Sequence, residues 1–279
     1  MKIEKAGIIT KHGSSEPKRI AAELTEWFAS RSIAAVIDEV TPDLDILVIL
    51  GGDGTLLHVA DRARRYDIPV MGINLGGLGF LTEVAVEERF EALEAILAGP
   101  VDIEERMMLK VKRHDRRSGE ASDYLYALNE IVISKGEIDQ LVQLSAWMDE
   151  EYLATYRADG LIFSTPTGST AYNLSAGGPV VHPGLASIMV TPICPFMLES
   201  RPVLLPATIT LTTRLIGTDR AVKVIVDGRF AWEMTADHQL EMAAAEKPLL
   251  LIGSPRKGYF DILRNKLNWG GRGVTVHRG

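Results

Sequence analysis

The segment that most constrains this chain runs from Ile46 to Leu57, where an unbroken aliphatic stretch stops abruptly at a glycine-rich turn. The run Ile46–Leu50 predicts a parallel strand that is buried on both faces. Three glycines around one carboxylate come next, and a helical pattern follows them. The segment therefore predicts a strand–turn–helix unit whose turn exposes backbone N–H groups. The apolar face of the predicted helix consists of Leu56, Leu57, Ala60 and Ala63.

Such a turn suits an anion, because first-turn N–H groups lack partners and glycine lets a phosphate approach the backbone. Asp53 is the unexpected member, since a carboxylate repels phosphate. Two interpretations remain open at this point. In the first interpretation, Asp53 caps the N-terminus of the helix, a position where Asp is a favoured residue. Alternatively, it stays ionised to accept a proton from a hydroxyl, or to hold a metal ion that phosphate also binds. The turn matches neither the P-loop pattern nor a GxGxxG fingerprint.

Composition and charge narrow the classes of function that this chain can have. The chain has 279 residues, enough for one large domain or two modest ones, and its net charge of −7 disfavours non-specific binding of nucleic acid. The only cysteine, Cys194, has apolar neighbours, which predicts an inert buried thiol. The six histidines lack metal-ligand spacing, and no apolar run reaches membrane-spanning length. We expect a cytoplasmic protein that has neither nucleic-acid nor membrane partners and no metal ligands of its own.

Strand and helix patterns alternate over residues 1–100, which predicts an α/β domain with a doubly wound parallel sheet. A second glycine loop, Asn74–Leu81, follows the last of these strands. Ligands of such sheets bind at the carboxyl ends of strands, where both loops would lie. Strands are predicted at Ala6–Thr10, Ile33–Ile37, Ile46–Leu50 and Pro69–Leu75, and helices after Ser14 and over Phe90–Leu97.

The pattern becomes strand-rich after Pro100, which predicts a mostly antiparallel β domain over residues 101–255. Tyr124–Ser134 is expected to be one of its strands, and Pro248–Ile252 its last strand. The tail, 256–279, is predicted to form a helix that packs back on the first domain. Its apolar side consists of Tyr259, Ile262, Leu263 and Leu267.

A second functional candidate is the segment Ala158–Pro179, where glycines and small hydroxyl residues follow a short strand. Its donors are suited to a polar ligand such as a nucleotide, although a Gly/Pro-rich connector has the same composition. The pair Asn129–Glu130 is either a ribose-binding pair or part of a solvent-facing strand surface. Arg157 and Asp159 either contact a base or form a surface ion pair. His58 is either a polar-face residue or a phosphate contact.

Together these pieces resemble the NAD kinase family. The family's Gly-Gly-Asp-Gly-Thr motif stands at Gly51–Thr55, its Asn-x-Gly-x-Leu-Gly-Phe-Leu loop at Asn74–Leu81, and its Asn-Glu pair at Asn129–Glu130. The long signature beginning Asp-Gly-Leu-Ile runs from Asp159 to Tyr172 and continues to Pro179. Further landmarks are Thr191–Pro195 and Lys266–Gly270. The first motif is shared with lipid kinases, whereas the signature that begins at Asp159 is much more specific.

The resemblance implies phosphorylation of the adenosine-ribose 2′-hydroxyl of NAD by ATP, with Mg²⁺ or another divalent metal arriving on ATP. It also implies an α/β domain followed by a β-rich domain, with the site between them, in a homodimer or homotetramer. Asp53 would be the catalytic proton acceptor. The resemblance assigns NAD binding to Asp53, Gly54, His58, Asn129, Glu130, Arg157, Asp159, Thr170, Ala171, Tyr172, Asn173, Leu174 and Ser175. It assigns phosphate binding to Gly51, Gly52, Gly54, Thr55, Asn74, Gly76 and Gly77.

Two residues depart from the family pattern. Phe196 stands where relatives often have His, and Arg229 stands after Asp227–Gly228 where relatives often have Gln. Two other function classes stay open: a related lipid or sugar kinase, which an intact signature at Asp159 disfavours, and a non-catalytic NAD(P)-binding sensor, which an intact Asp53 disfavours. The sequence leaves open whether polyphosphate replaces ATP, whether NADH is accepted, and whether NADP or NADPH regulates the protein.

Overall fold

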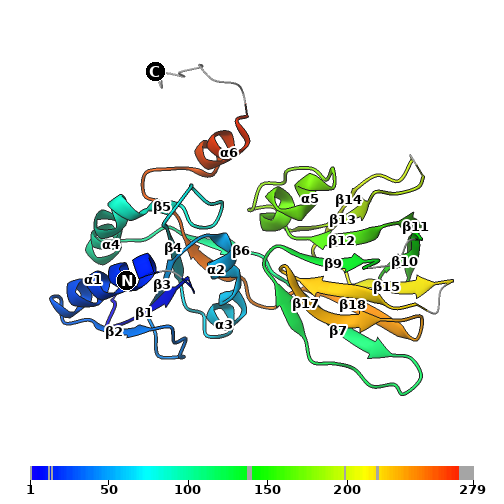
Figure 1. The fold of residues 1–279 in the computed structure, drawn as a ribbon, viewed down its shortest axis with the longest axis horizontal. Helices are drawn as coiled ribbons and strands as arrows, with labels where there is room; N and C mark the ends of the chain where they lie inside the picture. Colours follow the sequence, from blue (N-terminus) through cyan, green and yellow to red (C-terminus); the bar gives the residue numbers. More distant parts are fainter. Residues whose placement is uncertain are drawn as a thin grey trace. The chain divides into compact units, whose positions relative to one another are not determined.

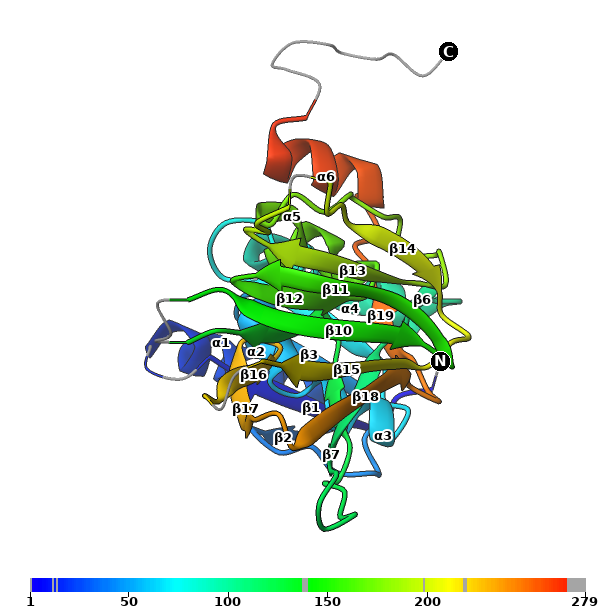
Figure 2. The same ribbon diagram turned by 90° about the vertical axis from the view of Figure 1, so that its right-hand side faces the viewer.

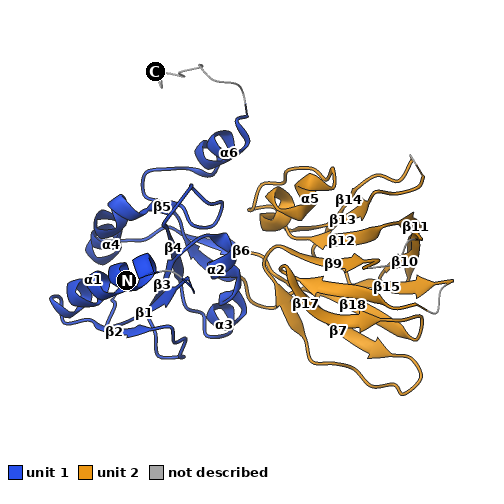
Figure 3. Cartoon of the chain, viewed as in Figure 1, with its two compact units in different colours: residues 1–105, 249–279 blue, residues 106–248 orange. Residues whose placement is uncertain are grey.

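The computed structural model describes residues 2–11, 13, 15–136, 140–197, 199–217 and 220–269. The chain forms two compact units (Figure 3). Unit 1 comprises residues 1–105 and 249–279, and unit 2 comprises residues 106–248. Residues 270–279 of the predicted tail lie outside the described residues. None of the helices described in the structure is long and apolar enough to cross a membrane.

Unit 1 contains a seven-stranded sheet with strand order β2-β1-β3-β4-β19-β6, and β5 pairs with β4 (Figure 1). β1 pairs in parallel with both β2 and β3, so the strand order reverses at β1, as in doubly wound folds. The strands are β1 (Lys5–Thr10), β2 (Ala34–Ile37), β3 (Ile46–Leu50), β4 (Val70–Asn74), β5 (Val84–Ala85), β6 (Ile103–Arg106) and β19 (Leu249–Ile252).

Both faces of this sheet are covered. All five residues of β3 are completely buried, and its alternate residues Ile46, Val48 and Leu50 join a core with α1 and α4. The helices are α1 (Ser15–Ala29), α2 (Asp53–Leu57), α3 (Ala60–Arg65), the 3₁₀ turn η1 (Val86–Glu88), α4 (Arg89–Ala98) and α6 (Tyr259–Leu267). The predicted α/β architecture of the first hundred residues is therefore confirmed.

The prediction for the helix after the first glycine loop is wrong in two details. The single helix predicted after the first glycine loop is split at His58–Val59, because the N–H of Val59 bonds the carbonyl of Leu56 in a tighter turn. Leu57 is consequently only half-buried, whereas Leu56 is fully buried.

The strand predicted at the end of the second domain belongs instead to unit 1. β19 pairs in parallel with β4, with Leu251 opposite Val70, and it lies between β4 and β6 in the sheet. Unit 1 is therefore completed by a segment that follows unit 2 in sequence. α6 also belongs to unit 1, and its Ile262 and Leu263 are buried.

Unit 2 contains two six-stranded sheets that share one apolar core (Figure 2). In the described residues of unit 2, the strands pair antiparallel, as predicted. The first sheet has the order β11 (Glu151–Ala158), β10 (Val142–Met148), β15 (Leu211–Ile216), β18 (His238–Ala244), β7 (Leu109–Asp115), β8 (Leu125–Ala127). The second has the order β14 (Val203–Pro206), β13 (Ser187–Ile193), β12 (Gly160–Ser164), β9 (Glu130–Ser134), β16 (Val222–Val226), β17 (Arg229–Met234). The 3₁₀ turn η2 (Thr167–Thr170) and α5 (Tyr172–Ser175) follow β12.

The strand predicted over Tyr124–Ser134 is divided between the two sheets. β8 pairs with β7 in the first sheet, whereas β9 pairs with β12 and β16 in the second. The chain therefore changes sheets at Leu128–Asn129. This crossing brings Asn129 and Glu130 to the carboxyl end of β12, because Glu130 lies opposite Ser164.

Cys194 also differs from the prediction. It follows β13 at the surface, with an exposed thiol and a backbone φ of 45°. The apolar neighbours that suggested burial lie in β13, but the strand ends at Ile193, one residue earlier. β13 is buried along nearly its whole length, and this burial ends with the strand, before Cys194.

Candidate functional site

Asp53 is the first helical residue of α2, and its side chain turns toward the second glycine loop. Its carboxylate accepts hydrogen bonds from the N–H groups of Phe80 (2.9 Å), Leu81 (3.1 Å) and Thr82 (3.0 Å), and from the Thr82 hydroxyl (3.0 Å). The helix is capped by Gly52, and no side chain bonds the cap. The capping interpretation of Asp53 is therefore wrong, and its carboxylate instead joins the two glycine loops.

The second loop is held by further hydrogen bonds. The Thr82 hydroxyl accepts a hydrogen bond from Asn74 Nδ2 (2.9 Å), and Asn74 Oδ1 accepts one from the N–H of Gly76 (2.7 Å). A Cβ on Gly79 would overlap both Asp53 Oδ1 and Thr82 Oγ1. Asn74, predicted as a phosphate ligand, is 7% exposed and directs its side chain into this network. Its polar groups thus shape the loop.

The glycines of both loops fall into two classes. Gly51 packs against Thr55, because a Cβ on Gly51 would overlap the Thr55 hydroxyl. In contrast, a Cβ on Gly52, Gly54 or Gly77 would meet no atom within 4 Å. Packing within the chain therefore requires glycine at Gly51, whereas the other three leave open space beside the backbone. Open space there is what the approach of a phosphate needs.

His58 follows α2, and its side chain is exposed. Its N–H bonds the carbonyl of Gly54 at 3.4 Å, so it lies one turn after the glycine loop. Gly54 is also exposed, and Thr55 is half-buried. These three residues therefore stay accessible, unlike the neighbouring Leu56, which enters the core.

In unit 2, three segments meet where β12 ends. Asn129 and Glu130 lie at the start of β9, the Thr165 segment follows β12, and Asp227 follows β16. The Asp227 carboxylate accepts the N–H groups of Leu128 (2.7 Å), Asn129 (2.8 Å) and Glu130 (3.1 Å). Asp227 was not among the predicted site residues. The available signal was an Asp-Gly pair between two apolar strands, which predicts a hairpin turn but not the N–H donors that bond the Asp227 side chain.

Glu130 is buried rather than solvent-facing, with 8% of its surface exposed. Burial raises the pKa of its carboxyl to about 7, and the nearby Asp227 carboxylate adds to the rise, whereas the N–H of Tyr172 opposes it. Burial also raises the pKa of Asp227 to about 6, against three opposing backbone hydrogen bonds. Glu130 Oε2 is buried and has no hydrogen-bond partner among the residues that the structure describes. Because buried acceptors are normally satisfied, this oxygen is available to a ligand hydroxyl.

The segment after β12 forms two short turns, η2 and α5. Asn173 is completely buried within it: Nδ2 donates to the carbonyls of Ser169 (3.2 Å) and Pro179 (3.0 Å), and Oδ1 accepts from Thr191 (2.6 Å). Asn173 thus ties the loop to β13 and has its side-chain hydrogen bonds made inside the protein. Tyr172 is 44% exposed. The other predicted residues of the segment, Thr170, Ala171, Leu174 and Ser175, are half-buried or exposed.

Arg157 and Asp159 lie at the opposite end of β12 from Glu130. β12 starts at Gly160, opposite Ser134, and a five-residue strand is about 16 Å long. Asp159 pairs with Lys135 at 2.6 Å, and the guanidinium of Arg157 stacks on Phe196 with its carbon 4.9 Å from the ring centroid. Within this chain, the predicted dinucleotide residues of unit 2 therefore form two separate groups. Arg229, the second departure from the family pattern, is exposed in β17.

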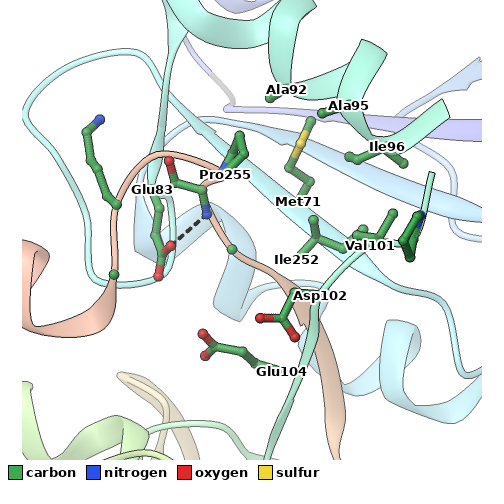
Figure 4. Close-up of a pocket in the computed structure, with 15 residues that line it drawn as sticks. Met71, Glu83, Ala92, Ala95, Ile96, Val101, Asp102, Glu104, Ile252 and Pro255 are labelled. Carbon is green, nitrogen blue, oxygen red and sulfur yellow. Dashed lines mark hydrogen bonds between the residues drawn. The ribbon is translucent and has the colours of Figure 1, made fainter. Parts of the chain in front are cut away.

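A cavity of about 330 Å³ lies in unit 1 beside α4 and β19 (Figure 4). Met71 and Ile252 contribute apolar lining, and Glu83 and Glu104 contribute carboxylates. Glu83 accepts the N–H of Ser254 at 2.9 Å, so it also holds the loop that follows β19. None of the predicted site residues lines this cavity.

Comparisons with known proteins match both units. Residues 5–101 match the family model described as the ATP-NAD kinase N-terminal domain, and residues 128–254 match the ATP-NAD kinase C-terminal domain. A protein named NAD kinase from Solibacter usitatus is 40% identical over 286 residues, covering 97% of this chain and 99% of that protein. One of the same name from Geotalea daltonii is 38% identical, covering 97% of this chain and 100% of that protein.

Two solved structures share the fold. Yeast NADH kinase complexed with NADH has a TM-score of 0.88 at 22% identity, and the match covers 99% of this chain and 90% of that one. An NAD kinase from Archaeoglobus fulgidus in complex with ATP has a TM-score of 0.72 at 24% identity, covering 95% and 97% of the two chains. These likenesses show a shared fold.

Proposed function

Since this chain belongs to the ATP-NAD kinase family, we propose that it transfers the γ-phosphoryl group of ATP to the adenosine-ribose 2′-hydroxyl of NAD. The products are NADP and ADP. The resemblance noted from the motifs is thus confirmed at the level of the family, and the chain is a phosphotransferase.

The observation that supports this chemistry best is the placement of Asp53. Its carboxylate is oriented by four hydrogen bonds and lies next to glycines whose surroundings are open. In the proposed step, Asp53 accepts the proton of the 2′-hydroxyl. The freed oxygen forms a bond to the γ-phosphorus while the bond between that phosphorus and the β,γ-bridging oxygen breaks. Phosphoryl transfer requires mainly positioning and charge neutralisation from a protein.

The remaining contacts are assigned from accessibility. We assign phosphate binding to the backbone of Gly52, Gly54 and Gly77, where no atom blocks an approaching oxygen. Glu130 and Asn129 are proposed to bind ribose hydroxyls, supported by the unpartnered Oε2 of Glu130. The exposed side chains of His58 and Tyr172 are proposed as further NAD contacts. Asn74 and Asn173 act indirectly, each within its own unit: the hydrogen bonds of Asn74 shape the second glycine loop, and those of Asn173 shape the segment after β12.

We propose that Mg²⁺ reaches the protein bound to ATP. In the described part of the chain, no three His, Cys, Asp or Glu side chains are grouped so that they could hold a metal ion. Mg²⁺ in kinases is bound by substrate phosphates with one or two carboxylates, so such a group is not required. Asp53 is a carboxylate of this kind beside the glycine loops. When bound, the ion would neutralise charge on the phosphates.

The deciding experiment measures NADP formation by the purified protein with Mg-ATP and NAD, read with an NADP-specific dehydrogenase. We expect NADP from the wild type and a loss of at least about 100-fold in kcat for Asp53→Ala. Asp45→Ala is the matched control, because Asp45 also accepts two backbone N–H groups, those of Glu4 and Lys5, but precedes β3 instead of following it. Near-wild-type turnover by Asp53→Ala would exclude Asp53 as the proton acceptor.

The same assay separates the remaining alternatives. NAD binding without turnover, with polyphosphate tested as a second donor, would favour an NAD(P)-binding sensor. Turnover of a lipid or sugar without NADP formation would favour a related kinase. NADH is tested as a second acceptor. We further propose that the protein is cytoplasmic and forms a homodimer or homotetramer. Light scattering of the purified protein tests the oligomeric state.

A further inference from the structure

The chain's crossing between sheets creates a local problem in unit 2. At Leu128–Asn129 the backbone leaves the first sheet and enters the second, and the N–H groups at this crossing bond a side chain instead of a neighbouring strand. Buried N–H groups without acceptors are costly, and native proteins pair nearly all of them. Three of these groups, on Leu128, Asn129 and Glu130, find one acceptor in the Asp227 carboxylate.

The geometry of Asp227 suits that task. Val226 pairs with Arg229, so Asp227 and Gly228 form a two-residue hairpin turn between β16 and β17. Their φ values are 46° and 78°, as a type I′ turn requires. A fourth hydrogen bond runs in the opposite direction: the N–H of Asp227 donates to the carbonyl of Glu130 at 3.0 Å. The hairpin and the Asn-Glu turn are thus joined by four hydrogen bonds.

The opposite side of the Asn-Glu turn is held by the segment after β12. The carbonyl of Asn129 accepts the N–H of Thr165 at 2.9 Å, and the carbonyl of Leu128 accepts the Thr165 hydroxyl at 2.5 Å. A Cβ on Gly168 would overlap the Asn129 carbonyl. The backbone is therefore held by hydrogen bonds on both sides, while Glu130 Oε2 has no hydrogen-bond partner in the described part of the chain. This arrangement fixes the backbone and leaves a side-chain oxygen for a ligand.

From these contacts we propose that Asp227 is a positioning residue for dinucleotide binding: its carboxylate holds Asn129 and Glu130 in the orientation that binds ribose hydroxyls. The inference rests on the proposed function, because it requires those two side chains to contact NAD. Asp227 itself touches backbone rather than substrate. Its effect is therefore expected in NAD binding and not in the interaction with ATP.

The substitution Asp227→Asn tests the role of the carboxylate separately from that of the hairpin turn. Asn-Gly favours the same type I′ turn, so the hairpin is kept. The amide supplies one oxygen in place of two, and its NH₂ group would face an N–H donor. At least one charge-assisted hydrogen bond is lost. We expect the KM for NAD to rise about tenfold or more, while the KM for ATP changes less than about twofold.

The matched control is Asp149→Asn. Asp149 also has a positive φ, 51°, and its carboxylate accepts the N–H of the distant Thr210 at 2.9 Å, but it lies in the β10–β11 turn of the other sheet. The Asp149→Asn substitution alters a similar structural contact and should leave the KM for NAD and the KM for ATP unchanged. An unchanged KM for NAD in Asp227→Asn, or equal changes in both variants, would overturn the inference.

A second readout separates this inference from the proposed function. NAD affinity is measured by calorimetry for the wild type and both variants, without ATP. If the wild type binds NAD but forms no NADP, the proposed activity fails, while a selective loss of affinity in Asp227→Asn still supports the positioning role. If the wild type does not bind NAD, both proposals are refuted.

Discussion

The carboxylates of Asp53 and Asp227 are each surrounded by backbone donors from a different part of their unit. Asp53 bonds a loop 27 to 29 residues further along the chain, and Asp227 bonds a turn 97 to 99 residues earlier. Neither partner set follows from local sequence. At the scale of residues, the motifs marked Asp53 correctly as a special residue, but only the folded contacts exclude its role as a cap and reveal Asp227 as its counterpart in unit 2.

Glu130 gives a pH prediction at this scale. Its pKa is raised from 4.5 to about 7 by burial, so the folded protein binds the proton more tightly than the unfolded chain. The free energy of unfolding should therefore fall as pH rises from about 4.5 to about 7, by at most about 3 kcal/mol. Glu130→Gln removes this contribution, and the variant should lose less stability than the wild type between pH 5 and pH 8.

Urea unfolding at several pH values measures this difference. Glu151→Gln, at an exposed position of β11, serves as the control for replacing a carboxylate in the same unit. Identical pH profiles for Glu130→Gln and the wild type would show that the buried carboxyl does not titrate as stated.

At the scale of elements, the two glycine loops form one structure because Asp53 and Thr82 join them. This predicts opposite outcomes for two neighbouring substitutions. Gly79→Ala places a methyl group onto Asp53 and Thr82, so we expect a stability loss of about 1–3 kcal/mol and loss of NADP formation. Gly77→Ala meets no atom, so stability should change by less than about 0.5 kcal/mol.

The kinetics of the second variant test the proposed phosphate site. If phosphate approaches the backbone at Gly77, the added methyl group obstructs it and the KM for ATP rises. Denaturant unfolding of both variants and steady-state kinetics of Gly77→Ala are the measurements. Equal stability losses in the two variants would contradict the division of the glycines into packed and open classes.

At the scale of the molecule, unit 1 is discontinuous and unit 2 is an insertion within it. β19 lies between β4 and β6, so unit 1 lacks an interior strand until the chain has passed through unit 2. We expect residues 106–248 alone to fold with a cooperative thermal transition. Residues 1–105 alone should not, whereas the same residues joined by a short linker to 249–269 should.

Circular dichroism and thermal unfolding of the three fragments test this expectation. Cooperative unfolding of residues 1–105 alone would mean that β19 is dispensable for the sheet of unit 1. The control for the linked fragment is the same fragment with Leu249 and Leu251, both fully buried, changed to Ser. That version should lose the transition, because the strand can no longer enter the core.

The sequence alone determined the features that depend on neighbouring residues. The aliphatic run Ile46–Leu50 predicted a strand buried on both faces, and the alternation of strands and helices predicted the doubly wound sheet. The glycine and Asp159 motifs indicated the family, because each is a contiguous pattern. Local periodicity carries this information since it reports which faces of an element are apolar.

Tertiary structure decided the features that depend on partners distant in the chain. Periodicity cannot tell which strands pair, so β19 was assigned to the wrong domain and the sheet crossing at Leu128–Asn129 was missed. The exposure of Cys194 depends on where β13 ends, and the importance of Asp227 depends on backbone groups almost one hundred residues away. Hydrogen-bond partners and strand neighbours are set by the packing of the whole unit, whereas faces and motifs are set by adjacent residues.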